Sequence, residues 1–189
     1  MSRDAVAGLV GATFGLVFVL VNAGPLPTPY DVAVRALGVV LYVGVAVLLV
    51  RAGNEAGNGA GNGAGSAEVG PRAVRTYWTT VALEVVLLLG GATLLGRTGH
   101  SGLSLPWVVC VVGLHFVPFA SAFGAPFYLR LAGILVTLGV TGAVLALSGV
   151  DSAWVSLVSG VGAGLALLGF AIRPATRTHH ATSARGDRP

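Results

Sequence analysis

Two side chains with acid–base chemistry stand inside stretches of sequence that are otherwise apolar. Glu84 lies seven residues into the apolar stretch 77–95, and His115 lies near the middle of the stretch 105–123. An acid at the centre of a membrane helix costs about 2.5–3.5 kcal/mol on insertion scales, so we expect Glu84 to face the interior of a helical bundle. A carboxylate beside an imidazole can share or transfer a proton, and this pair is therefore the leading candidate for chemistry.

The spacing of Glu84 and His115 predicts that the two side chains meet. A turn near residues 100–101 separates their helices, with Glu84 some 16 residues before it and His115 some 15 residues after it. Antiparallel neighbours of this kind carry the two residues at nearly the same depth, which predicts a hydrogen bond or an ion pair. Polar contacts between membrane helices are worth only about 0.6 kcal/mol on average, yet they specify packing. We favour a structural role over a proton or ion pathway, and a small-molecule or lipid-headgroup site is the third alternative.

Two further residues extend this candidate site. Thr80 lies one helical turn before Glu84 on the same face, so it is predicted to join the polar network. Pro118 follows His115 by three residues and cannot donate to the carbonyl of Leu114, which predicts a helix kink and a free acceptor. One histidine and one carboxylate are too few for zinc, which takes three or four ligands, so no metal and no other cofactor is predicted.

The composition is that of an integral membrane protein. Of 189 residues, 54% are hydrophobic and 10% are charged, against about 25% charged residues in a soluble domain. All 11 basic residues are arginines at the ends of apolar stretches, rather than one block interleaved with aromatic residues, and this excludes a nucleic-acid interface. The single cysteine, Cys110, excludes an intrachain disulfide.

Six apolar stretches approach the length of about 20 residues that a membrane-spanning helix needs. The stretches are continuous, whereas the strands of a membrane barrel are shorter and alternate polar with apolar residues. Backbone polar groups in lipid must pair within their own segment, which favours helices. The predicted fold class is all-α, a polytopic membrane bundle of six transmembrane helices within residues 1–175. The predicted spans are 5–21, 32–50, 77–95, 105–123, 127–147 and 153–172.

Other sequence features bear on loops and packing. Residues 53–70 are low-complexity Gly, Asn and Ala and predict a flexible loop, and the polar, basic tail 176–189 is predicted to be disordered. Small residues recur every four positions in the first and sixth spans, which predicts that these two helices pack closely against each other. They are Ala7, Gly11 and Gly15, and Ser156, Gly160 and Gly164.

The distribution of arginine predicts the orientation in the membrane. If the N-terminus is cytoplasmic, only Arg35 and Arg97 fall outside, and the positive-inside rule then places both termini in the cytoplasm and the chain in the plasma membrane. The nine arginines on the inner side are Arg3, Arg51, Arg72, Arg75, Arg130, Arg173, Arg177, Arg185 and Arg188. The alternative for residues 5–21 is a cleaved signal peptide, because Val21-Asn22-Ala23 has the small-residue pattern of a cleavage site.

Two of these arginines are interpreted as topology anchors. Arg35 lies four residues after Asp31 at the outer start of the second span, a spacing that predicts an ion pair on one helix face. Arg130 lies at the inner start of the fifth span. Both side chains are long enough to extend toward water from the edge of the bilayer.

The segment GLHFVPFASAFGAPFY, Gly113 to Tyr128, resembles one found in a family of small uncharacterised bacterial multi-pass membrane proteins. In that family a Gly-Leu-His-Phe-x-Pro run ends one helix and a short loop enters the next. The resemblance implies no known activity and carries over no catalytic residue. It does imply that His115 and Pro118 belong to one motif.

Sequence signatures of enzymes are missing from the chain. It contains no HExxH, paired-aspartate or P-loop pattern, and no inverted repeat relates its two halves. We therefore predict a small non-enzymatic multi-pass membrane protein with a buried Glu84–His115 pair. The alternative is a proton-coupled or ion transporter that uses the same pair. The lipid bilayer is the partner that the sequence indicates, while a homo-oligomer or a membrane-protein partner stays open.

Overall fold

The computed structural model describes residues 3–59, 71–122 and 125–172, which form helices and short connections. The first five spans are α1 (Arg3–Asn22), α2 (Tyr30–Gly59), α3 (Pro71–Arg97), α4 (Ser104–Ala122) and α5 (Phe127–Leu147), with a 3₁₀ turn, η1 (Ser101–Leu103), before α4. The sixth span, here called the sixth helix, is continuous but has three parts: α6 (Ser152–Val155), the π-helical η2 (Ser156–Val161) and α7 (Gly162–Ala171). Six helices are long and apolar enough to cross a membrane, and the described residues contain no strand, so the predicted all-α polytopic fold class is confirmed.

The helix bounds correct one predicted boundary. Residues 53–59 were predicted to belong to a flexible loop, but α2 continues through them to Gly59. A long apolar helix already supplies the costly nucleus, and each further residue adds a hydrogen bond, so even glycine-rich sequence can extend it. Residues 60–70 of the predicted loop and the predicted tail 176–189 lie outside the described residues.

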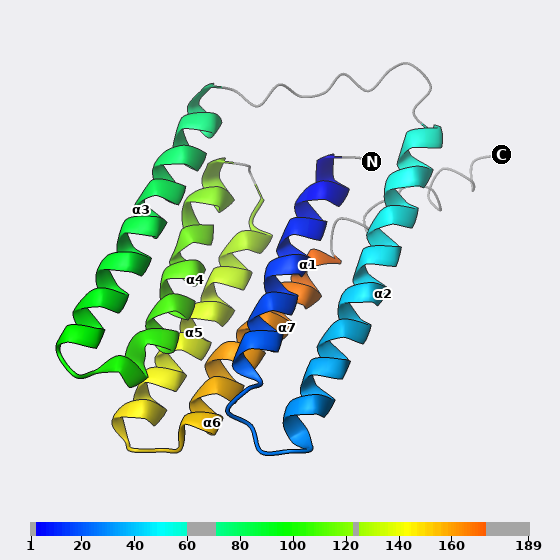
Figure 1. Cartoon of the computed structure of the whole chain (residues 1–189). Coiled ribbons are helices and arrows are strands. Elements are labelled where there is room, and N and C mark those ends of the chain that lie inside the picture. The colour runs from blue at the N-terminus through cyan, green and yellow to red at the C-terminus, as the bar shows by residue number, and fades with distance from the viewer. Residues whose placement is uncertain (1–2, 60–70, 123–124, 173–189) are drawn as a thin grey trace.

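The helices pack in an order that differs from their order in the chain. Neighbouring helices follow one another as α3, α4, α5, the sixth helix, α1 and α2. Figure 1 shows α3 and α2 at opposite sides of the bundle, although they are consecutive in sequence. Every pair of consecutive spans runs antiparallel, so α2 and α4 end at the same end of the bundle where α1, α3 and α5 begin.

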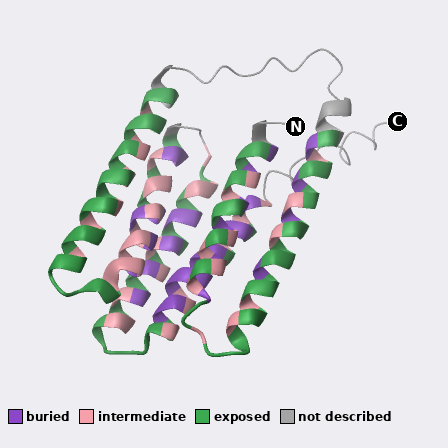
Figure 2. Cartoon of the chain, viewed as in Figure 1, coloured by how far each residue is buried: buried purple, intermediate pink, exposed green. Residues whose placement is uncertain are grey.

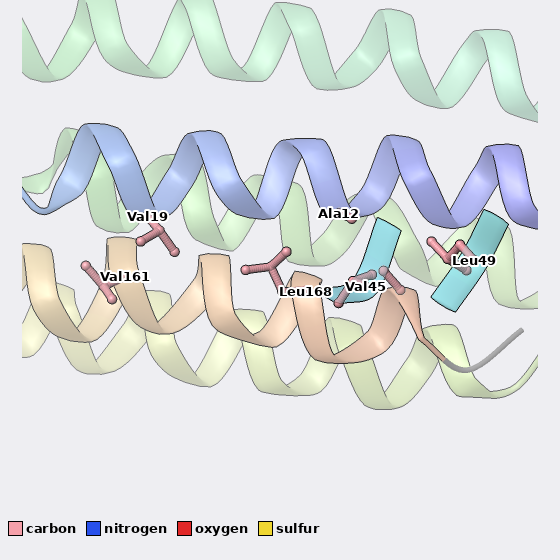
Figure 3. Close-up of a cluster of buried hydrophobic side chains, with 7 residues drawn as sticks. Ala12, Val19, Val45, Leu49, Val161 and Leu168 are labelled. Carbon is pink, nitrogen blue, oxygen red and sulfur yellow. The ribbon is translucent and has the colours of Figure 1, made fainter. Parts of the chain in front are cut away.

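The sixth helix lies at the centre and contributes to two clusters of buried side chains. The first cluster joins it to α1 and α2 through Ala12, Val19, Val45, Leu49, Val161, Leu168 and Ala171 (Figure 3). The second cluster joins it to α4 and α5 through Val109, Leu131, Leu135, Ala163 and Leu167. Half of the sixth span is buried inside the protein, the largest share of any span. The sixth helix therefore connects the two halves of the bundle.

The contact between α1 and the sixth helix is close enough to require glycine. A Cβ atom built on Gly164 would lie 2.6 Å from the carbonyl oxygen of Gly15, and one on Gly15 would lie 2.8 Å from the carbonyl oxygen of Gly164. The predicted packing of these two helices is thus confirmed at Gly15 and Gly164. The predicted row on α1 was wrong elsewhere, because Gly8 faces the sixth helix and Leu49 while Gly11 faces open space.

The outermost helices have little buried surface. None of the α3 span is buried inside the protein, and α3 packs mainly on α4. Figure 2 shows buried positions gathered on the central helices, whereas α3 is largely exposed along its length. In a bilayer these exposed apolar side chains face lipid, since backbone polar groups are already paired within each helix.

Candidate functional site

The α3–α4 hairpin brings Glu84 and His115 together. The Nδ1 atom of His115 lies 2.9 Å from the Oε2 atom of Glu84. This contact joins the middle of α3 to the middle of α4, at equal distances from the turn formed by η1. The helical rise of 1.5 Å per residue is constant, which is why counting residues from the turn predicted the same depth for both.

The pair is partly exposed rather than buried. The side chain of His115 is 11% exposed and that of Glu84 is 19% exposed. The Nδ1 atom itself is enclosed, yet it lacks the alignment of a regular hydrogen bond to any neighbour in the described part of the chain. The contact therefore has the distance of an ion pair but not the direction of a hydrogen bond, and a small rotation of either side chain would complete it.

A group of aromatic rings surrounds His115 on α3, α4 and α5. The His115 ring lies edge-on to Phe119 at 4.4 Å and to Phe116 at 5.6 Å between centroids. Phe119 also stacks on Tyr77 of α3 at 5.7 Å and contacts Tyr128 of α5 at 6.2 Å. The sequence interpretation did not include this cluster. Its signal was present, since Phe116 and Phe119 lie one and four positions after His115 and so share its side of α4.

A second polar contact fixes the far half of the hairpin. The indole Nε1–H of Trp107 donates to the backbone carbonyl of Leu87 at 2.9 Å. The Trp107 ring lies directly over Gly91, where there is no room for a Cβ atom. Tyr77, Glu84 and Gly91 are spaced by seven residues, so they form one stripe along α3 that faces α4. This stripe and its partners on α4 are called the α3–α4 seam.

The two other residues predicted for the site stand outside the pair. Thr80 is partly buried, but no hydrogen bond joins it to Glu84 or His115 among the described residues. Pro118 lies inside α4, which continues through it to Ala122, and its carbonyl accepts the hydroxyl of Ser121 at 3.0 Å. The predicted kink at Pro118 stays a prediction.

The predicted ion pair at the start of α2 was wrong. Arg35 is exposed and its guanidinium lies against Gly24, in the connection between α1 and α2. The Oδ1 atom of Asp31 is enclosed without a hydrogen-bond partner in the described structure. A four-residue spacing allows the pair, but a long side chain at a helix start can turn toward the loop instead. Arg130 is exposed in the first turn of α5, as expected for a residue at the membrane edge.

The chemistry available at this site is proton sharing within a membrane-spanning hairpin. The described residues contain no group of three His, Cys, Asp or Glu side chains close enough to hold a metal ion. Glu84 and His115 supply one acceptor and one group that can donate or accept, enclosed by aromatic rings.

Comparisons with known proteins do not extend this description. No protein-family model, no curated protein and no solved structure matches the chain. The resemblance of residues 113–128 to a bacterial membrane family therefore stays a prediction, and function is argued from the site alone.

Proposed function

We propose that the chain is a small non-enzymatic multi-pass protein of the plasma membrane in which the Glu84–His115 pair holds α3 against the bundle. The contact of 2.9 Å between these two side chains carries the proposal. None of the α3 span is buried inside the protein, so apolar packing contributes less to its position than to that of any other span. Polar contacts specify which helices pair when lipid solvates apolar faces as well as protein does.

The distribution of charge supports an orientation with both termini in the cytoplasm. Nine of 11 arginines belong to one side of the membrane in the six-span order, and the described ones, Arg51, Arg75 and Arg130, are exposed at the same end of the bundle. This is the bias expected for cytoplasmic segments. Reporter fusions after Pro189 test it: a reporter active only in the cytoplasm is expected to be active.

Retention of α1 is part of the proposal. α1 lies between α2 and the sixth helix and contributes Ala12 and Val19, both fully buried, to the first core cluster. Removal of α1 as a signal peptide would leave α2 with few other contacts. Mass spectrometry of the purified membrane protein is expected to find residues 3–22 present, and their loss would contradict this part of the proposal.

Proton or ion movement through the same pair is the second candidate function. The partial exposure of both side chains favours it, because a proton pathway needs access to the pair. The decisive measurement is proton flux into proteoliposomes for the wild type, Glu84→Gln and His115→Ala at matched insertion. Flux that both substitutions abolish would replace the structural proposal with a transporter. No flux in the wild type, together with lower stability of His115→Ala, is the expected result.

A further inference from the structure

Arg75 and Arg130 converge on one corner of the bundle. Tyr77, two residues after Arg75, and Tyr128, two residues before Arg130, both contact the ring of Phe119 near the end of α4. Two residues correspond to about 3 Å along a helix axis, so each arginine lies within one turn of a ring in this cluster. The beginnings of α3 and α5 therefore present one arginine each beside the end of α4. This corner is called the α3–α5 corner.

The charges at the α3–α5 corner lack a negative partner. Both side chains are exposed, and neither guanidinium pairs with an acid in the described part of the chain. The first turns of α3 and α5 contain no acidic residue. The start of a helix carries about half a positive charge, which disfavours a nearby cation and favours an anion. The end of α4 offsets part of this, although its Ala120 carbonyl already accepts the amide of Ala125.

The opposite end of the bundle shows the usual arrangement of charge. Asp31 lies in the first turn of α2, and Asp151 caps the sixth helix by accepting the amide of Ala153 at 2.7 Å. Arg97 lies in the last turn of α3, where the partial charge of the helix is negative. Every charge there matches its helix terminus. The reversed arrangement at Arg75 and Arg130 is therefore a local feature and not a property of the whole chain.

The aromatic residues set the depth of this corner and the class of its ligand. Trp78 is 64% exposed and Tyr77 is also exposed at the start of α3, and such rings lie at the level of lipid headgroups. Arginine binds phosphate through two parallel N–H donors, and basic surfaces between membrane helices bind the headgroups of anionic lipids. We propose that Arg75 and Arg130, with Tyr77 and Trp78 beside them, bind the phosphate of an anionic phospholipid. The inference rests on the membrane location but not on the role of Glu84 and His115.

Lipid selectivity of the full-length protein tests the proposal. The probes are spin-labelled phosphatidylglycerol and spin-labelled phosphatidylcholine in vesicles, and the measurement is their relative association with the protein. The wild type is expected to prefer phosphatidylglycerol, and Arg75→Gln or Arg130→Gln is expected to lower that preference by a factor of about five. Lysine at either position keeps the charge but loses the paired donors, so Arg75→Lys is expected to fall between the two.

Arg51→Gln is the matched control. It removes one exposed charge at the same end of the bundle, but from α2, which packs on α1 and the sixth helix. It is expected to leave the preference nearly unchanged. An equal loss in Arg51→Gln would indicate a diffuse surface charge and overturn the site, as would a wild type without preference. Competition by inorganic phosphate in the buffer would overturn the assignment to lipid. Helical circular dichroism identifies any variant that fails to fold, and the lysine variants then decide the outcome.

Discussion

The sixth helix and α3 are apolar spans of similar length that reach their places by different contacts. Half of the sixth span is buried and none of the α3 span is. The sixth helix uses Gly160 and Gly164 to approach α1 closely, and its Ser159 hydroxyl donates to the carbonyl of Leu138 at 3.1 Å. The helix α3 instead uses the α3–α4 seam, where large side chains meet through polar and aromatic contacts. A central helix is thus held mainly by shape, and a peripheral one by a few specific contacts.

The largest loss of stability is expected from a small change at the centre. Gly164→Ala places a Cβ atom 2.6 Å from the carbonyl oxygen of Gly15, and overpacking of this kind costs about 1–3 kcal/mol. The measurement is the free energy of unfolding in detergent mixtures, followed by circular dichroism. Gly169→Ala, in the same helix but facing open space, is the control and is expected to be neutral or stabilising. Equal losses in both variants would remove the argument from close approach.

Breaking the ion pair is expected to loosen α3 by a smaller amount. His115→Ala leaves the Glu84 carboxylate without its partner, and such a loss costs about 1–3 kcal/mol in a low-dielectric setting. A double-mutant cycle with Glu84→Gln isolates the coupling between the two side chains, which is expected to lie below about 1.7 kcal/mol. Thr80→Val serves as the control on the same face of α3. A coupling of zero would mean that the contact does not hold the hairpin.

The other half of the α3–α4 seam is tested by removing one hydrogen bond. Trp107→Phe keeps a large ring over Gly91 but loses the donor to the Leu87 carbonyl. The expected cost is about 0.5–1.5 kcal/mol in the free energy of unfolding. The matched control is Trp154→Phe, at an exposed tryptophan in the sixth helix. If the control loses as much stability as Trp107→Phe, the effect belongs to the interface with lipid and not to the seam.

The smallest effect is expected at Arg35. Its guanidinium makes no ion pair with Asp31, so Arg35→Gln is expected to change the unfolding free energy by less than about 0.5 kcal/mol. Thermal unfolding of the two proteins side by side measures this difference. A loss above about 1 kcal/mol would show that the charge at this end contributes to packing in a way that the seam does not.

The sequence predicted the features that depend on hydropathy and on helical rise. Continuous apolar stretches defined the six spans, and counting residues from the η1 turn paired Glu84 with His115. Features that depend on the choice between similar side-chain arrangements were missed. The chain has 29 glycines, so several four-residue rows compete on α1 and only packing selects the row with Gly8 and Gly15. The rotation of Arg35 toward Gly24 has the same origin.

The π-helical segment was also beyond sequence reasoning. It covers Ser156–Val161, where Ser159 fits against Gly142 of α5 and Gly160 fits against Asn22 of α1. A single turn with wider hydrogen bonds lets one helix meet two neighbours at once, and such turns depend on tertiary contacts rather than on local propensity. No periodicity in the residues 152–171 indicates it.

The central place of the sixth helix has a consequence for biosynthesis. A ribosome releases α1 to α5 into the membrane before it completes residues 152–171, and both core clusters lack their shared member until then. The α1–α2 pair and the α3–α5 group must therefore remain in the bilayer as separate hairpins during translation. Assembly of the bundle is the last event, and a chain interrupted before Ser152 would present two unjoined halves to the proteases of the membrane.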